Sequence, residues 1–192
     1  MAGFQAIAAT GEAMRKLLAN ACPSEFSGAQ FKLYQISDFG NPMDEGISLY
    51  LYRLAVSGAR RTLPPTVGPD GRRYRPPIPL DLHYIASVWG KTAIKQQRLL
   101  GWMIRMFEDV PILPVGLLND NGPDPEVFEP NETVEVLFES INLQDWNNLW
   151  SPTKTNAPLS VGYVARMIGI SSTMPLSEAP HVQTRELALG KR

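Results

Sequence analysis

The sequence contains few of the residues from which metal sites and nucleophilic active sites are built. Its 192 residues include one cysteine, Cys22, and two histidines, His83 and His181. A lone cysteine can form neither an internal disulfide nor a cysteine-based zinc site, and it suits a reducing compartment. The zinc-binding H-E-x-x-H, phosphate-binding G-x-x-x-x-G-K-[ST] and nucleophile-elbow G-x-S-x-G patterns are absent as well. We therefore expect no metal, no cofactor and no enzymatic activity.

The chain also lacks an excess of charge of one sign and a long apolar run. Its formal net charge is −1, and charged residues make up 19% of the chain, below the roughly 25% typical of soluble domains. This balance disfavours nucleic acid and anionic membranes as partners. No run approaches the roughly 18 apolar residues of a membrane span, and no signal-peptide pattern begins the sequence, so we expect cytoplasmic synthesis without membrane insertion. The low charge indicates instead a surface covered by other subunits.

The periodicity of the apolar residues predicts a single α+β domain. Helical spacing covers two segments, and strand-like alternation covers four, with a single helical turn between the last two strands. The predicted helices are 4–21 and 92–111, the strands are 30–39, 46–57, 133–141 and 157–171, and the turn is 142–150. This order predicts a mainly antiparallel β-sheet flanked by helices. We assign 1–171 to this domain and 172–192 to a C-terminal arm that is mobile or bound to a partner.

The same periodicity predicts which side chains are buried. In the second helix, one stripe contains Ile94, Leu100, Met103, Ile104 and Phe107. In the last strand, alternation assigns Leu159, Val161, Tyr163, Ala165 and Met167 to one face. Trp146 and Trp150, in the helical turn, are more typical of a core contact than of a ligand site.

A basic loop lies between the second strand and the centre of the chain. Residues 58–77 are rich in proline and glycine, with a turn signal at Gly68-Pro69-Asp70-Gly71, which favours the long tip of a hairpin. The loop places five arginines near a single acid, Asp70; they are Arg60, Arg61, Arg72, Arg73 and Arg75. An acidic protein partner is the favoured interpretation of this cluster, and a nucleic-acid backbone is the alternative.

The stretch PPIPLDLHYIASVWG, residues 77–91, places an aspartate and a histidine inside an apolar strand. Asp81 and His83 share one face of such a strand and could form half of a nucleophilic triad, as in a small hydrolase. No nucleophile with a matching motif accompanies them. The favoured interpretation is a polar pair in a structural strand whose Leu80, Leu82 and Tyr84 face the helix at 92–110.

Several segments in this order resemble a known family. They are SLYLYRLAVS, PPIPLDLHYIASVWG, QQRLLGWMIRMFEDVPIL and EVLFESINLQDWNNLWSPTKTNAPLSVGYVARMIGI. Over about residues 5–171 the chain is similar to the cap, or tube-terminator, proteins of extracellular contractile injection systems. The most specific parts are LDLHY, LLG, LW and SVGYVAR. They supply a set of motif residues with an expected structural role: Leu80, Asp81, Leu82, His83, Tyr84, Leu99, Leu100, Gly101, Leu149, Trp150, Ser160, Val161 and Tyr163.

The resemblance implies a tail-terminator-like fold and a structural function. Such a subunit would form a homohexameric ring on the last layer of the inner tube, contact the end of the sheath and hold the extended state. Its partners would be further copies of itself, the inner tube protein and the sheath protein, without a small-molecule substrate. Family members can carry longer C-terminal regions than this sequence has. The alternatives that stay open are a binding module that uses the Arg60–Arg75 loop and a hydrolase that uses Asp81 and His83.

Overall fold

The protein is built on one five-stranded sheet with the order β1-β2-β5-β7-β6. The computed structural model describes residues 2–58, 63–120, 126–151 and 157–176. The sheet strands are β1 (Gln30–Tyr34), β2 (Gly46–Val56), β5 (Ile78–Trp89), β6 (Glu135–Glu139) and β7 (Ser160–Ile170). Only β1 runs parallel to its neighbour, and the other pairs are antiparallel. The α+β class with a mainly antiparallel sheet is therefore confirmed.

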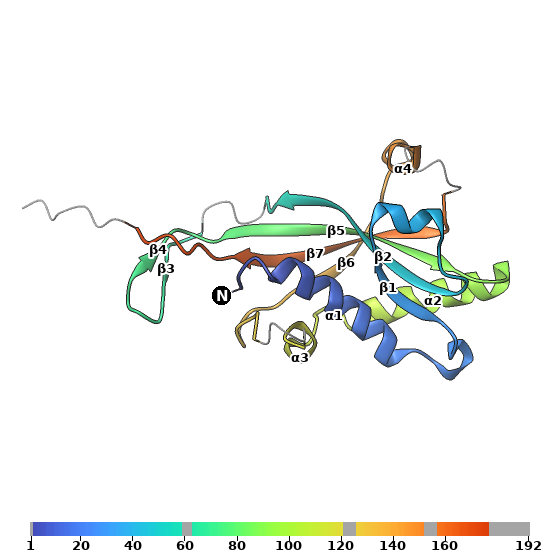
Figure 1. The fold of residues 1–192 in the computed structure, drawn as a ribbon, viewed down its shortest axis with the longest axis horizontal. Helices are drawn as coiled ribbons and strands as arrows, with labels where there is room; N and C mark the ends of the chain where they lie inside the picture. The colour runs from blue at the N-terminus through green and yellow to red at the C-terminus, as the bar shows by residue number, and fades with distance from the viewer. Residues whose placement is uncertain (1, 59–62, 121–125, 152–156, 177–192) are drawn as a thin grey trace, which may run out of the picture.

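Helices cover both faces of this sheet. The helices are α1 (Ala6–Ala21), α2 (Ala93–Asp109), α3 (Val115–Leu118) and α4 (Leu143–Trp150). The first three pack on one face, and α4 lies on the other face together with a 3-10 turn at Ile36–Gly40 (Figure 1). Among the described residues, no helix has the length and hydropathy to cross a membrane.

The sheet separates two buried clusters. The larger cluster joins α1, α2 and α3 to the side chains on one face of β5, among them Leu80, Leu82 and Tyr84. The smaller cluster consists of Phe39, Ile85 and Trp150, with partly buried aromatic residues packed around it. Nearly every residue of β5 is buried because both of its faces are covered. A central strand with two covered faces explains why its sequence is an almost continuous apolar run.

Several predicted elements need correction. The predicted strand 30–39 ends at Tyr34, and a 3-10 turn follows it. In α2 the buried residues are Leu99, Met103 and Phe107, whereas Ile94 is 72% exposed because it lies in the first turn, next to the Thr92 cap. Trp150 is buried as expected.

A bulge in β7 overturns the predicted face of Met167. Leu82 pairs with Ala165 and Leu80 with Ile168, so β7 has one more residue than β5 in this interval. Met167 has a φ of 72° and is 47% exposed, while Ala165 and Ile168 are both fully buried. The extra residue changes the parity of the strand, and Met167 leaves the core face.

A small second sheet extends from one end of the molecule. It pairs β3 (Thr66–Val67) with β4 (Arg73–Tyr74), within the connection from β2 to β5. Figure 1 shows this hairpin at one end of the long axis, with the five-stranded sheet extending away from it toward α2 and α4. The long hairpin predicted from the proline-rich loop is thus present in the described residues.

Candidate interaction surfaces

A polar network surrounds His83 on the face of the sheet that carries α4. His83 Nδ1 lies 2.8 Å from each carboxylate oxygen of Glu139, and Nε2 lies 3.4 Å from Nη2 of Arg53. Arginine can only donate, so Nε2 accepts and Nδ1 carries the proton that it donates to Glu139. The hydroxyl of Tyr52 donates to the same carboxylate at 3.2 Å. The charges of Arg53 and Glu139 are balanced across an imidazole that is 6% exposed.

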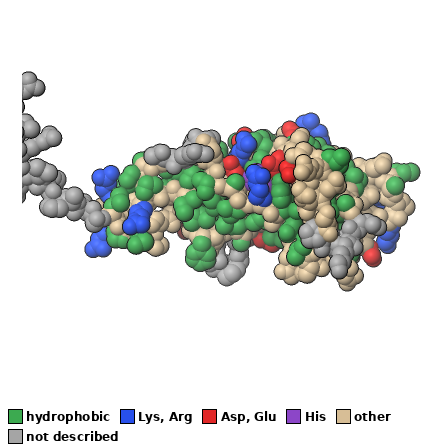
Figure 2. Space-filling view, turned by 90° about the horizontal axis from the view of Figure 1, so that it is seen from above, with side chains coloured by type: hydrophobic (Ala, Val, Ile, Leu, Met, Phe, Trp, Pro, Cys, Tyr) green, Lys and Arg blue, Asp and Glu red, His purple; other side chains and the backbone are tan. Residues whose placement is uncertain are grey.

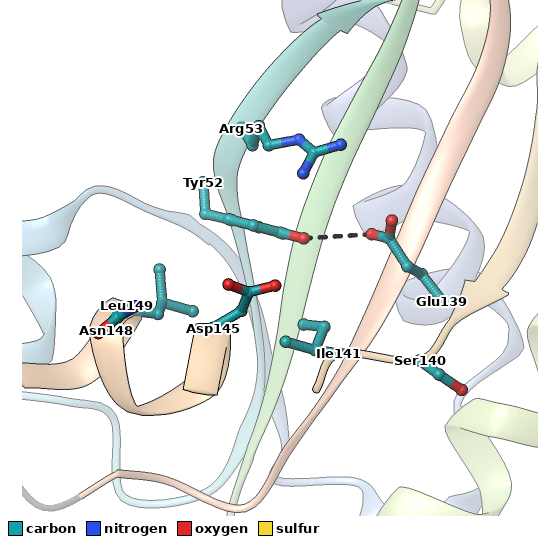
Figure 3. Close-up of a pocket in the computed structure, with 8 residues that line it drawn as sticks. All are labelled: Tyr52, Arg53, Glu139, Ser140, Ile141, Asp145, Asn148 and Leu149. Atoms are coloured by element: carbon teal, nitrogen blue, oxygen red, sulfur yellow. Dashed lines mark hydrogen bonds between the residues drawn. The ribbon is translucent and has the colours of Figure 1, made fainter. Parts of the chain in front are cut away.

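A bulge in β2 brings two of these side chains to the same face. Leu51 pairs with Tyr84 and Arg53 with His83, so Tyr52 is the additional residue on β2. In a regular strand, Tyr52 and Arg53 would point to opposite faces. The bulge instead directs both of them to one face, where Tyr52 contacts Glu139 (Figure 3) and Arg53 contacts His83.

Asp81 is not part of this network. It shares a face of β5 with His83, as expected, but the described residues show no hydrogen bond between the two side chains. Asp81 Oδ1 is buried and has no hydrogen-bond partner among the described residues. The predicted Asp81–His83 pair is therefore wrong, because Glu139 occupies the position beside the imidazole. The arrangement does not support a hydrolase, since Nε2 of His83 faces the guanidinium of Arg53, which is only a donor and cannot act as a nucleophile.

A groove of about 350 Å³ opens beside the network, between β2, the end of β6 and α4. Its lining includes Tyr52, Arg53, Glu139, Ile141, Asp145 and Leu149. Figure 3 shows the carboxylate of Asp145 below the Tyr52 ring and the guanidinium of Arg53 above it. Burial raises the pKa of Tyr52 to about 12. The negative charges of Glu139 and Asp145 also raise this pKa, whereas the positive charge of Arg53 lowers it. We name these six residues the Tyr52 groove.

The basic loop forms a defined arm, residues 66–75. Asp70 accepts hydrogen bonds from the hydroxyl of Tyr74 at 2.8 Å and from the backbone N–H of Arg72 at 3.1 Å. Both contacts fix the turn at the tip, where Gly71 has a φ of 74°. Beyond β4, the backbone of 174–176 pairs with Arg73 and Arg75. Within the arm, β4 is thus paired on both edges, with β3 on one side and residues 174–176 on the other.

The arginines of the arm are solvent-exposed. Arg72 lies 3.8 Å from Asp70 with 74% of its side chain exposed. Arg73 on β4 and Arg75 just after β4 are both exposed, and in the described part of the chain neither forms an ion pair. Arg60 and Arg61 lie outside the described residues. Figure 2 shows basic side chains at the arm end, without acidic ones beside them, whereas further along the molecule acidic and basic side chains lie together.

The motif residues lie mostly in the two clusters. Leu80, Leu82, Tyr84, Leu99 and Tyr163 are buried in the larger cluster, with Leu100 and Val161 packed against it. The ring of Tyr163 contacts that of Phe107 in a tilted arrangement, with ring centroids 4.7 Å apart. Trp150 and Leu149 belong to the smaller cluster. Ser160 Oγ donates to Ser87 Oγ at 2.7 Å, and Gly101 is exposed on α2.

Sequence reasoning missed three residues of this site: Glu139, Arg53 and Gly162, whose missing side chain allows the backbone of Glu139 to approach closely. Gly162 pairs with Glu139, and a Cβ at this position would lie 2.6 Å from the Glu139 carbonyl oxygen and 2.9 Å from Ile141. The alternation of Glu135 and Glu139 with buried Val134 and Val136 was the available signal, because it assigns both acids to the face opposite the larger core. It could not show that β7 lies next to this strand, with β5 on the far side of β7.

Comparison with known proteins identifies the family. The model for the Pvc16 N-terminal domain matches residues 9–184. The chain belongs to the Pvc16 N-terminal domain family. Among the curated proteins, none matches this chain at a significant level.

Two solved structures share the fold of this Pvc16 N-terminal domain. One is a PVC sheath/tube terminator in its extended state, from an extracellular contractile injection system, with a TM-score of 0.62, 13% identity and coverage of 97% of this chain and 64% of that one. The other is the tube-terminating cap of the anti-feeding prophage, with a TM-score of 0.55, 14% identity and coverage of 95% and 60%. The predicted likeness to cap and terminator proteins is confirmed. The chain spans less than two thirds of the length of each.

Proposed function

We propose that this Pvc16-type domain is a structural terminator of a contractile injection system. In this role it forms a homohexameric ring at one end of the particle, contacts the inner tube and the sheath, and stabilises the extended state without catalysing a reaction. The observation that carries the proposal is the fold shared with the PVC sheath/tube terminator over 97% of this chain. The family match over residues 9–184 supports it independently of the fold.

The edges of the sheet suit a subunit that has two neighbours. In the described chain, β1 pairs with β2 only from Gly46 to Tyr50, so the outer edge of β2 from Leu51 to Val56 has no adjacent strand. Leu54 and Val56 on this edge are 45% and 61% exposed. On the opposite edge, residues 111–113 pair with β6 as far as Val136, and Phe138 beyond this pairing is 45% exposed. Exposed apolar side chains beside unpaired backbone favour association, including the addition of a partner's strand.

In this proposal the C-terminal arm, residues 172–192, also contributes contacts to the assembly. Residues 174–176 already pair with β4, so the chain beyond them begins next to the basic arm. We assign 172–192 to contacts with the tube or the sheath.

The proposal is tested by imaging the protein with a tube and sheath preparation. We expect density at one end of the particles only, and a mass of six chains for the ring by light scattering. A matched control is the variant Tyr163→Lys, which places a charge in the larger core and prevents folding. Labelling along the whole length of the sheath, or no binding of the folded chain to any particle, would contradict a terminator role.

A further inference from the structure

The molecule carries two complementary surfaces that it cannot join within one chain. The Arg73–Arg75 face of the arm is basic, and the Tyr52 groove contains two carboxylates and one guanidinium. Figure 1 shows the arm and α4 toward opposite ends of the long axis, connected by the rigid strands of the sheet. The arm of one chain therefore cannot reach its own groove.

The groove is chemically suited to a guanidinium group. Glu139 is 24% exposed, and a carboxylate has about four acceptor positions, of which His83 and Tyr52 leave some unused. Asp145 accepts from Asn142 through Oδ2, while Oδ1 has no hydrogen bond in the described structure. The ring of Tyr52 offers a face for a planar cation, and Ile141 and Leu149 offer apolar contact for its aliphatic stem.

The arm supplies such a group in a fixed position. The turn hydrogen bonds of Asp70 and the backbone pairing with 174–176 order the ribbon before any partner binds. Asp70 interacts with Tyr74 and Arg72, so it does not neutralise Arg73 or Arg75. An ordered donor loses less conformational entropy on binding than a mobile loop would.

We propose that the arm of one copy docks its Arg73–Arg75 face into the Tyr52 groove of a neighbouring copy. That this contact joins adjacent subunits of a ring rests on the proposed function. The pairing of arm and groove does not depend on it, because both surfaces belong to this chain. The arm of one copy meets the groove of the next, so the two sides of the interface are different surfaces. Such a heterologous interface can repeat from copy to copy around a closed ring.

Charge reversal of the full chain tests the contact. We expect Arg73→Glu/Arg75→Glu and, separately, Asp145→Lys to weaken self-association at least tenfold in light scattering, because like charges then face each other. Combining the three substitutions in one chain should restore association to within about threefold of the unmodified chain. Glu139 is left intact because it supports His83. The matched control is Arg98→Glu/Arg105→Glu, which makes the same charge change on α2 and should leave association unchanged.

Disulfide trapping locates the contact without depending on ring formation. In a Cys22→Ser background, a chain with Arg73→Cys is mixed with a chain carrying Asn148→Cys, a residue that lines the groove. We expect a mixed disulfide dimer, and no mixed dimer when the second chain carries Arg105→Cys instead.

The outcomes separate this inference from the proposed function. If the reversed chains associate normally, or if the combined variant is not restored, the arm does not occupy this groove even where the protein still decorates tube ends. A chain that stays monomeric and gives no mixed disulfide also overturns the inference. Trapped, rescued association together with a failure to bind tube ends would uphold the contact and reject the terminator role.

Discussion

At the residue scale, His83 connects three strands that are not consecutive in the sequence. It lies on β5, and its partners Arg53 and Glu139 lie on β2 and β6, with β7 between β5 and β6. A buried polar group stabilises a fold only when its hydrogen bonds are made. Removing one partner leaves the others desolvated without a compensating hydrogen bond. The imidazole therefore acts as a structural bridge across the sheet.

This role gives opposite expectations for the two polar residues of the LDLHY motif. We expect His83→Ala to lower the free energy of unfolding by about 2 kcal/mol, because Arg53 and Glu139 lose their shared partner. We expect Asp81→Asn to leave stability unchanged or to raise it by up to about 1 kcal/mol, because the buried Oδ1 of Asp81 lacks a partner in the described chain. Urea denaturation followed by tryptophan fluorescence measures both values.

The two variants form a matched pair on the same face of β5. Asp81→Asn changes a side chain two residues from His83 without touching Glu139, so it controls for a general sensitivity of the strand. A large loss for Asp81→Asn together with a negligible loss for His83→Ala would contradict the observed network and return attention to the predicted Asp81–His83 pair.

At the element scale, α4 is anchored by few contacts. The ring of Trp150 lies 4.9 Å from that of Phe39 at an interplanar angle of 75°, and Asn142 caps the helix by accepting from the N–H of Asp145 at 2.8 Å. The smaller cluster contains three buried residues, whereas α1 and α2 share the larger one. The α4 layer is therefore expected to open before the rest of the fold.

Replacing Trp150 tests this order of stability. We expect Trp150→Ala to cost about 3 kcal/mol and to abolish hydrogen-exchange protection in α4 and in the 3-10 turn at Ile36–Gly40. Protection in α1 and α2 should persist, because their contacts lie across the sheet. The control Trp146→Ala removes a partly buried ring from the same helix and should have a smaller effect. Equal loss of protection on both faces would show that the two clusters unfold together.

The same elements show what the sequence could and could not predict. Apolar periodicity located α1, α2, β2, β6 and β7, because each has one face against a core. The bulges at Tyr52 and Met167 have no such signal, since they depend on the register with β5. The Tyr52 groove was missed for this reason: it requires the bulge in β2 and the adjacency of β6, β7 and β5. The parallel pairing of β1 with β2 could not be predicted either, because apolar periodicity does not show the direction in which two strands pair.

At the scale of the whole molecule, the arm is separate from the folded core. No residue of 66–75 belongs to either buried cluster, and its described pairing is within itself and with 174–176. An element that contributes no fully buried side chain has little effect on the stability of the domain that carries it. The sequence of the arm is therefore constrained less by the folding of the domain than by the surface of a partner that the arm contacts.

This separation predicts that the arm can be removed without unfolding the domain. We expect replacement of residues 66–75 by a Gly-Ser linker to shift the thermal midpoint by no more than about 3 °C, as for other surface changes in a domain of this size. Association of the chains should fall at least tenfold, because the basic surface is lost. A control with Arg72, Arg73 and Arg75 changed to lysine keeps the charge but not the planar guanidinium, so it should lose less association than the linker variant. Differential scanning calorimetry and light scattering measure the two effects, and a domain that unfolds with the loss of the arm would place this ribbon in the fold itself.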